Sequence, residues 1–167
     1  MRKYLLPAGI FLWHVVVSVE FLVLFIAVCL YCYCSFVREF FGGVNVGSEL
    51  KYGLLAMIIG VAAWVFAESK EIFWPNVESK TVLLEWPNYP HLKSCCLVAN
   101  LYAFLCATFA IAGAIFEDNV SKGLALYSTL VSIIVILIDA ASCWLANIQI
   151  RQLLEWFAKK KQEMNKK

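Results

Sequence analysis

Apolar residues in this chain form four long runs, separated by short stretches that carry most of the charges. The clearest run is residues 123–150, 28 residues between Lys122 and Arg151 that contain a single charged side chain, Asp139. A bilayer core about 30 Å thick is crossed by about 20 residues of apolar helix, because each residue adds about 1.5 Å. The run therefore predicts a transmembrane helix with length to spare.

The other three runs predict shorter or less regular spans. The first is 33 residues long (residues 5–37), which is too long for one upright crossing, so we place its span within it. The second has only 16 residues between Lys51 and Glu68, and it spans only if both charged side chains reach toward the interface or the bilayer thins locally. The third has 23 residues. The predicted spans are residues 13–36, 52–67, 94–116 and 123–150.

Two segments outside the spans carry further pattern. Residues 69–93 contain the pairs Trp74-Pro75, Trp86-Pro87 and Tyr89-Pro90. Residues before Pro favour extended backbone and Trp favours the membrane interface, so we expect a fixed loop along the membrane surface. After Arg151, apolar residues continue at helical spacing, and we expect that turn of helix to lie on the membrane before the basic tail.

Composition supports a membrane protein of one domain. The 167 residues are 62% hydrophobic and 16% charged, with a mean hydropathy of +0.76, which is too apolar for one soluble core. The expected fold is an all-α integral membrane protein, a four-transmembrane-helix bundle over residues 1–167 with a basic cytoplasmic tail at residues 151–167. No nucleic-acid recognition module accompanies the basic residues, so a nucleic-acid partner is not expected.

The distribution of Lys and Arg predicts the orientation. With both termini in the cytoplasm, eleven of these residues lie inside and three, Arg38, Lys51 and Lys122, lie outside. Cytoplasmic loops carry the excess of Lys and Arg. We therefore expect both termini, and the 69–93 loop, to be cytoplasmic.

Two acidic residues within the spans, Glu20 and Asp139, are the main candidates for chemistry. A carboxylate at membrane depth is costly and nearly always faces protein or a water-filled cavity. Two interpretations stay open: the pair relays protons or ions, or each is a neutral carboxyl that hydrogen-bonds to a neighbouring helix. The other polar residues expected inside the bundle are Ser128, Ser132 and Ser142 on the Asp139 stripe, and Asn100 in the third span.

Small residues on the second and third spans predict close helix packing. They recur at spacings of three and four, which lets another helix approach the backbone. The positions that we single out are Ala56 and Gly60 on the second span, and Ala103 and Ala107 on the third.

The seven cysteines do not predict a disulfide framework, a metal site or an enzyme. Most lie inside predicted spans, none shows metal-ligand spacing, and none is paired by spacing with a histidine that could act as a base. We expect no cofactor and no catalytic residue. Cys95 and Cys96, at the cytoplasmic start of the third span, are either palmitoylation sites or small packing residues.

The layout resembles that of a known family. Four spans, cytoplasmic termini, a short outer hairpin, and a last span that reads Leu137-Ile138-Asp139-Ala140-Ala141-Ser142 are similar to MARVEL-domain tetraspan proteins of the MAL and chemokine-like-factor type. This resemblance implies a role in membrane apposition, vesicle trafficking or stabilisation of a partner protein, without enzymatic activity.

We therefore expect a non-enzymatic structural or accessory protein in the plasma membrane or an endomembrane. It would associate laterally with other integral membrane proteins, as a homo- or hetero-oligomer. Its tail would bind the anionic cytoplasmic leaflet through Lys159, Lys160 and Lys161. The alternatives are a small proton- or ion-coupled carrier that uses Glu20 and Asp139, and an obligate subunit of a large membrane complex.

The charge bias generates a test of topology. Single cysteines placed in the C-terminal tail of a cysteine-free variant should be protected from a membrane-impermeant thiol reagent in intact cells, and should react after permeabilisation. A tail that reacts in intact cells would contradict the predicted orientation and invert the assignment of every loop.

Overall fold

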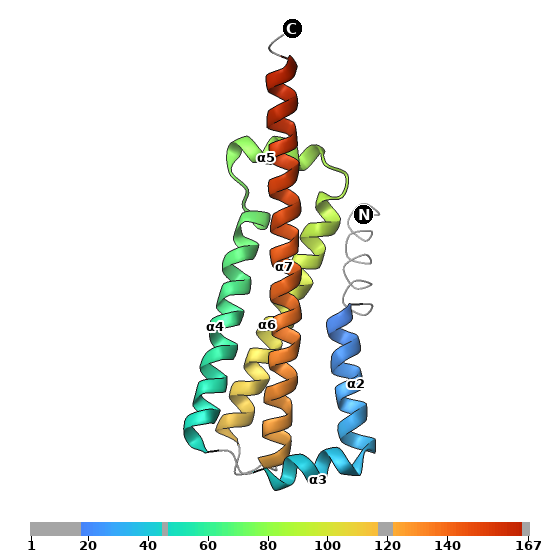
Figure 1. The fold of residues 1–167 in the computed structure, drawn as a ribbon, viewed down its shortest axis with the longest axis vertical. Coiled ribbons are helices and arrows are strands. Elements are labelled where there is room, and N and C mark those ends of the chain that lie inside the picture. Colours follow the sequence, from blue (N-terminus) through green and yellow to red (C-terminus); the bar gives the residue numbers. More distant parts are fainter. Residues whose placement is uncertain (1–17, 45–46, 117–121, 165–167) are drawn as a thin grey trace, which may run out of the picture.

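The computed structural model describes residues 18–44, 47–116 and 122–164, and these ranges contain helices and no strand. Four helices run along the long axis of the molecule, and two short ones cross it at opposite ends (Figure 1). The helices in these ranges are α2 (Val19–Tyr33), α3 (Ser35–Gly43), α4 (Ser48–Phe73), α5 (Val77–Glu85), α6 (Tyr89–Ile115) and α7 (Lys122–Met164).

Helices α4, α6 and α7 form the core of the bundle. Val65, Ala103 and Val135, one from each helix, are completely buried where the three helices meet. Large apolar side chains such as Phe109 and Trp144 point outward instead. A water-soluble protein rarely exposes so much contiguous apolar surface, whereas a bilayer accepts it. Three of the described helices, α4, α6 and α7, are long and apolar enough to cross a membrane, which is the coarse fold expected from the sequence.

The first predicted span differs from a single continuous helix. Within the described residues, α2 begins after Ser18, whose hydroxyl accepts a hydrogen bond from the Phe21 N–H at 3.1 Å. It ends at Tyr33, and α3 leaves at 87° to it. The expected span of residues 13–36 is therefore broken at its outer end, and residues 13–17 lie outside the described part of the chain. The bent pair counts as a fourth span only if α2 and α3 are taken together.

The bend has a clear sequence cause. Helix α3 has apolar side chains on one side and Arg38 and Glu39 on the other, a pattern that suits a helix lying in the interface rather than across the bilayer. By turning, α3 places the Phe41 ring 5.0 Å from the ring of Tyr127 on α7. The chain therefore turns instead of continuing as a straight span, and α3 gains an aromatic contact with α7.

Helices α4 and α6 are longer than the spans predicted for them. The span candidate in α4 is Glu49–Phe73, 25 residues, because the helix continues past both Lys51 and Glu68. Glu68 does not have to reach the interface, since the Asn147 amide on α7 donates hydrogen bonds to its carboxylate and to its backbone carbonyl. Because Glu68 has this partner inside the bundle, the second span is not limited to the residues between Lys51 and Glu68.

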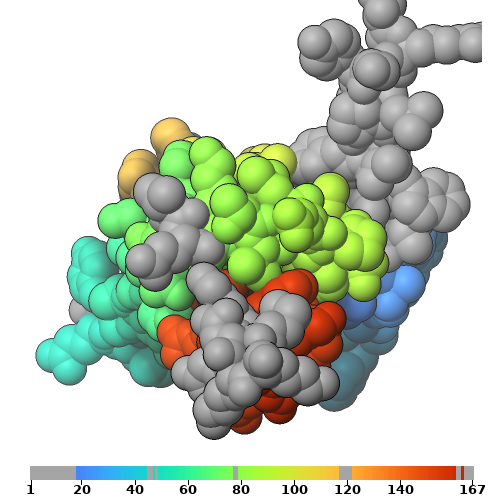
Figure 2. Space-filling model, turned by 90° about the horizontal axis from the view of Figure 1, so that it is seen from above, coloured from blue at the N-terminus to red at the C-terminus, as the bar shows by residue number. Residues whose placement is uncertain are grey.

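The segment 69–93 is mostly helical, whereas we expected a fixed loop along the membrane surface. It contains the end of α4, the whole of α5 and the start of α6. Pro90 does not block α6, because it occupies the first turn, where its missing N–H has no helical partner. Seen from this end, α5 and the start of α6 lie over the end of the bundle (Figure 2). Leu83 of α5 is almost fully buried there.

Helix α7 continues past Arg151, as the helical spacing of its apolar residues predicts, and it does not bend there. It runs on without a break to Met164 and rises beyond α5 (Figure 1). No Gly or Pro follows Gly123 in this helix, so nothing in its sequence ends it. Leu153 and Leu154 pack on the edge of the core, and an Arg151–Glu71 ion pair at 3.9 Å lies beside them. These contacts hold the extension on the bundle axis.

Helix α3 touches the start of α7 backbone to backbone. A Cβ atom added at Gly123 would lie 2.9 Å from the backbone nitrogen of Gly42. This is closer than a side chain can approach, so glycine is required at position 123. The contact fixes the outer end of the α2–α3 pair against α7.

Gly123→Val should therefore destabilise the protein by about 1–3 kcal/mol, the usual cost of overpacking. Gly53→Val is the matched control, because a Cβ at Gly53 meets nothing within 4 Å. Thermal unfolding in detergent should show a lower midpoint only for Gly123→Val. Equal midpoints would contradict the close approach of α3 and α7.

Candidate functional site

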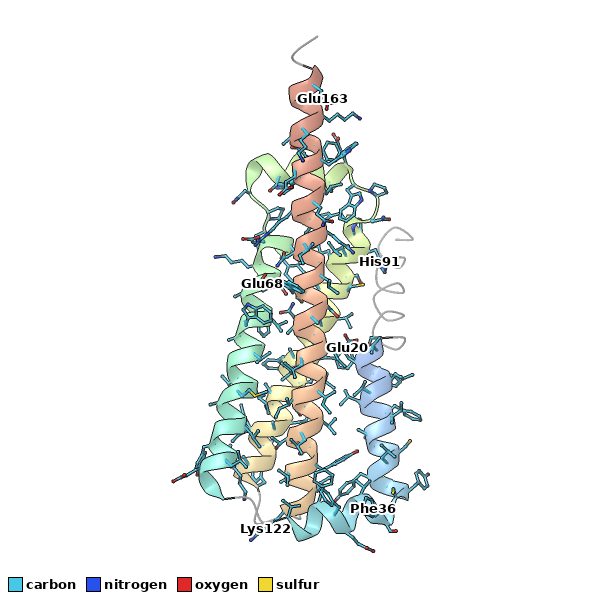
Figure 3. The ribbon with its side chains drawn as sticks, in the orientation of Figure 1. Glu20, Phe36, Glu68, His91, Lys122 and Glu163 are labelled. Atoms are coloured by element: carbon cyan, nitrogen blue, oxygen red, sulfur yellow. The ribbon has the colours of Figure 1, made fainter. Side chains whose placement is uncertain are left out.

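Two acidic residues meet inside the bundle, from α2 and α7. Asp139 is completely buried, and Glu20 is 7% exposed. The Glu20 carboxyl group is a direct neighbour of the Asp139 carboxyl group. Glu20 sits in the first turn of α2, on the side that faces α7 (Figure 3). The two acidic residues that the sequence analysis identified within the spans thus come together, although they are 119 positions apart in the chain.

A second group of polar side chains lies one helical turn further along α7. The Asn100 amide on α6 donates to the Ser69 hydroxyl at 2.6 Å and to the Cys96 carbonyl at 2.7 Å. Ser69 in turn donates to the carbonyl of Val65 at 2.8 Å. Its oxygen is 3.4 Å from the sulfur of Cys143. These contacts join α4, α6 and α7 through side chains in the interior.

The thiols complete this group. Cys96 on α6 and Cys143 on α7 are direct neighbours, and both are at most 2% exposed. Because the hydroxyl proton of Ser69 goes to a backbone carbonyl, the Cys143 thiol is the donor in its contact with Ser69. Each thiol therefore has a partner on a neighbouring helix.

Because α6 and α7 are antiparallel, the Glu20–Asp139 pair and the group around Ser69 lie at adjacent levels along the bundle. Cys96 pairs with Cys143, and the Cys106 thiol on α6 pairs with the Ser132 hydroxyl on α7. With the two helices antiparallel, Asn100 then lies level with Asp139. The residues form one set, which we call the polar cluster, with members on all four long helices: Glu20, Ser69, Cys96, Asn100, Asp139 and Cys143.

The polar cluster has more acceptors than donors. Both carboxyl oxygens of Asp139 and the amide oxygen of Asn100 are buried and have no hydrogen-bond partner among the described residues. Such oxygens are expensive in an apolar interior unless a proton, a water molecule or a cation satisfies them. The arrangement can therefore hold a shared proton or a small oxygen-liganded species.

The cluster continues toward the α5 end as a row on α7. Asp139, Cys143 and Asn147 follow each other at intervals of four residues, which places them on one side of the helix. Asn147 is 3% exposed and donates a hydrogen bond to Glu68, which is only half-buried. Polar side chains thus lead from the buried carboxyl pair to a partly exposed carboxylate.

The serines expected on the Asp139 stripe have different positions. Ser132 is 4% exposed, so it faces the interior as expected. Ser128 is half-buried and donates to the Ala125 carbonyl at 2.9 Å, within its own helix. Ser142 is exposed and does not join the cluster. At 100° per residue it points about 60° to one side of Asp139, whereas Cys143 lies about 40° to the other and faces α6.

The paired cysteines have unlike surroundings. Cys96 is buried and adjoins Cys143, which suits the interpretation of a packing residue. Cys95 is half-buried, and its sulfur lies 3.8 Å from Nδ1 of His91. Our expectation that no cysteine is paired with a histidine by spacing is therefore wrong, because His91 and Cys95 are four residues apart on α6 and share one side of the helix. Palmitoylation stays a prediction for Cys95.

The small residues also divide into two groups. Ala103 is completely buried in the core, and Ala107 is half-buried. Ala56 and Gly60 face outward, and a Cβ added at Gly60 would meet nothing within 4 Å. No described helix of this chain therefore uses the small face of α4.

The basic residues at the end of the chain lie well beyond the core. Lys159 and Lys160 are exposed, and the Lys160 ammonium lies 4.9 Å from the Trp156 ring centre. Lys161 belongs to α7, but its side chain is outside the described part. Lys159 is eight residues, or about 12 Å, past Arg151. Binding of all three to an anionic leaflet stays a prediction.

The sequence analysis did not identify three polar residues that belong to the polar cluster or extend it: Ser69, Glu68 and Asn147. Ser69 and Glu68 were placed outside the second span, because the run of apolar residues stops at Ala67. Asn147 was read as part of an apolar span, although its spacing of eight from Asp139 and four from Cys143 puts it on the same side of the helix. That spacing was the available signal. Nothing comparable pointed to Ser69.

Comparison of the chain with family models, with curated proteins and with solved structures found no match.

The inter-helix role of Ser69 generates a stability prediction. Ser69→Ala removes the acceptor of the Asn100 amide, and it should lower the free energy of unfolding by about 0.6–1.7 kcal/mol, the range measured for hydrogen bonds between membrane helices. Thr108→Ala is the control, because the Thr108 hydroxyl is exposed and bonds only to Phe104 of its own helix. Denaturant titration in micelles should separate the two variants. A Thr108→Ala effect as large as that of Ser69→Ala would contradict the role of Ser69.

Proposed function

We propose that this chain is a non-enzymatic, four-span accessory protein that associates laterally with another integral membrane protein through the outer face of α4. One observation carries the proposal: this face is made of small residues, and none of the described helices covers it. Gly53, Ala56, Gly60 and Ala63 are all exposed along it.

The two faces of α4 have opposite uses. One face supplies Ile58, Ala62 and Val65 to the core, where they are almost fully buried. The other repeats small residues at intervals of three and four, and Cβ atoms at Gly53 and Gly60 would have open space around them. In a bilayer, where lipid tails are as apolar as leucine, small residues promote association because they let two backbones approach closely. The outer face of α4 is suited to that use.

The remaining parts of the proposal follow the sequence. Both termini lie in the cytoplasm, together with the α5 end of the bundle, and the basic end of α7 meets the anionic leaflet. In support, α5 and the C-terminal end of α7 lie at the same end of the molecule (Figure 1). The resemblance to MARVEL-domain tetraspans fits a role in trafficking or in stabilising a partner. An obligate subunit of a large complex would associate through the same face, in a fixed stoichiometry with its partners.

Gly60→Leu tests this proposal. The added side chain points outward, so thermal unfolding of the purified chain should stay unchanged, while recovery of the wild-type partner set by co-purification should fall at least about tenfold, or about 1.4 kcal/mol. Tagged and untagged copies of the chain, expressed together, reveal whether a second copy is the partner.

Ala141→Leu is the matched control, since it adds similar bulk to an exposed position on α7. It should retain every partner. Partners that survive in Gly60→Leu, or that are lost equally in both variants, would contradict an interface on α4.

The carrier is a second candidate, and the buried carboxyl pair favours it. Glu20 and Asp139 adjoin each other without a cationic residue in the polar cluster, and the row from Asp139 to Asn147 leads toward Glu68. Buried carboxyl groups connected to an exposed one are the usual elements of a proton pathway.

Asp139→Asn separates the two functions. Asn has nearly the same shape and still forms hydrogen bonds, but it cannot release a proton. For an accessory protein, the Asn variant should fold and keep its partners, and neither protein should move protons in liposomes. A pH-driven flux in the wild type that disappears in Asp139→Asn would establish the carrier instead.

A further inference from the structure

Helix α2 packs against the bundle through Val23, Leu24 and Ala27, and a space remains between α2 and α6. At one end, Glu20 meets Asp139. At the other, α3 contacts α7 through Gly42 and Gly123. Midway along α2, the Tyr127 hydroxyl donates to the Ala27 carbonyl at 2.8 Å. These contacts leave a space between α2 and α6.

This space is a cleft of about 810 Å³ between α2, α6 and α7. Its walls are side chains such as Leu24, Leu105 and Val131, and its rim includes Val28 and Phe109, which are 61% and 67% exposed. Helix α3 crosses the outer end of the bundle, on the side of Tyr127 (Figure 1). The open side therefore faces the surroundings of the bundle laterally, between α2 and α6.

The polar groups in the walls do not call for a polar ligand. The hydroxyl of Tyr127 donates to the Ala27 carbonyl and that of Ser128 to the Ala125 carbonyl, while Ser132 adjoins the Cys106 thiol. No charged side chain lines the cleft. An apolar cavity with satisfied walls stays dry and accepts an apolar occupant.

Size and length identify the kind of occupant. One turn of a helix, about 10 Å wide and 5.4 Å high, fills about 420 Å³, so the cleft holds about two turns, whereas a membrane span has between about five and six. A partner helix does not fit. From Leu105 to Phe116 the cleft extends over eleven residues of α6, or about 17 Å, which is close to half of a bilayer core of about 30 Å. Half of the bilayer core corresponds to one leaflet, so the cleft is about as long as one leaflet is thick.

We propose that this cleft binds one acyl chain of a membrane phospholipid from the leaflet on the α3 side. The chain enters sideways between Val28 and Phe109, and its end lies near Cys106 and Ser132. The lipid then completes the packing of α2 against α6 and α7. This site is independent of the outer face of α4, which lies on another helix.

The test uses the full-length protein in phosphatidylcholine bilayers that contain a small fraction of phosphatidylcholine with a diazirine on one acyl chain. After irradiation, peptide mapping should place adducts on the cleft walls, residues 105–116 and 124–132, at least about tenfold above the lipid-facing positions Ile59 and Phe66 of α4. A tenfold preference corresponds to about 1.4 kcal/mol, the transfer of about two methylene groups.

Ala112→Phe fills the cleft and should lower this labelling about tenfold, while Ala141→Phe, at an exposed position outside the cleft, should leave it unchanged. If Ala112→Phe does not fold, Val28→Trp blocks the rim without touching the core. Adducts spread evenly over all lipid-facing positions, labelling that persists in the filled variants, labelling by a sterol probe alone, or chain-to-chain cross-links at the rim would each overturn the proposal.

Discussion

A carboxyl group buried at the centre of an apolar helix restricts what can surround it. Asp139 has no exposed surface, and the first charged residues on either side of it in α7 are Lys122 and Arg151. Neither can reach it, so its neighbours must come from other helices. They are Glu20 from α2 and the polar groups of α4 and α6 at the same depth. The bundle is thus organised around one level at which four helices share polar contacts.

Away from that level, the helices pack in two different ways. Small side chains on α6, including Ala99, Ala103 and Ala110, let α4 and α7 approach closely. Helix α2 has a narrower packed face, made of Val23, Leu24 and Ala27, and it is also held by Tyr127 and by the α3 contact. Close packing on one side and a cleft on the other follow from where the small residues lie. The small residues on the outer face of α4 suit it for association with a partner helix. The cleft beside α2, which no helix fills, suits a lipid chain.

The sequence predicts the helices of this fold better than their ends and contacts. Long apolar runs identify α4, α6 and α7, because the bilayer imposes a minimum length. The ends move because local partners decide them: Asn147 satisfies Glu68, so α4 continues, and Pro90 fits the first turn of α6. Of the candidate site, Glu20, Asn100 and Asp139 were identified because polar residues inside spans are rare. Ser69 and the Cys96–Cys143 pair depend on the register between helices, which the pattern of one chain does not contain.

A double-mutant cycle of Glu20→Leu and Asp139→Leu tests the central claim most directly. Each single variant leaves one carboxyl group in the interior without the neighbouring carboxyl group that can share a proton with it, so each should destabilise the protein strongly, while the double variant should cost clearly less than the sum. Unfolding of all four proteins in the same micelles gives the coupling free energy, and we expect at least about 1 kcal/mol. Additive effects, with no coupling, would contradict the contact between α2 and α7 around which the bundle is built.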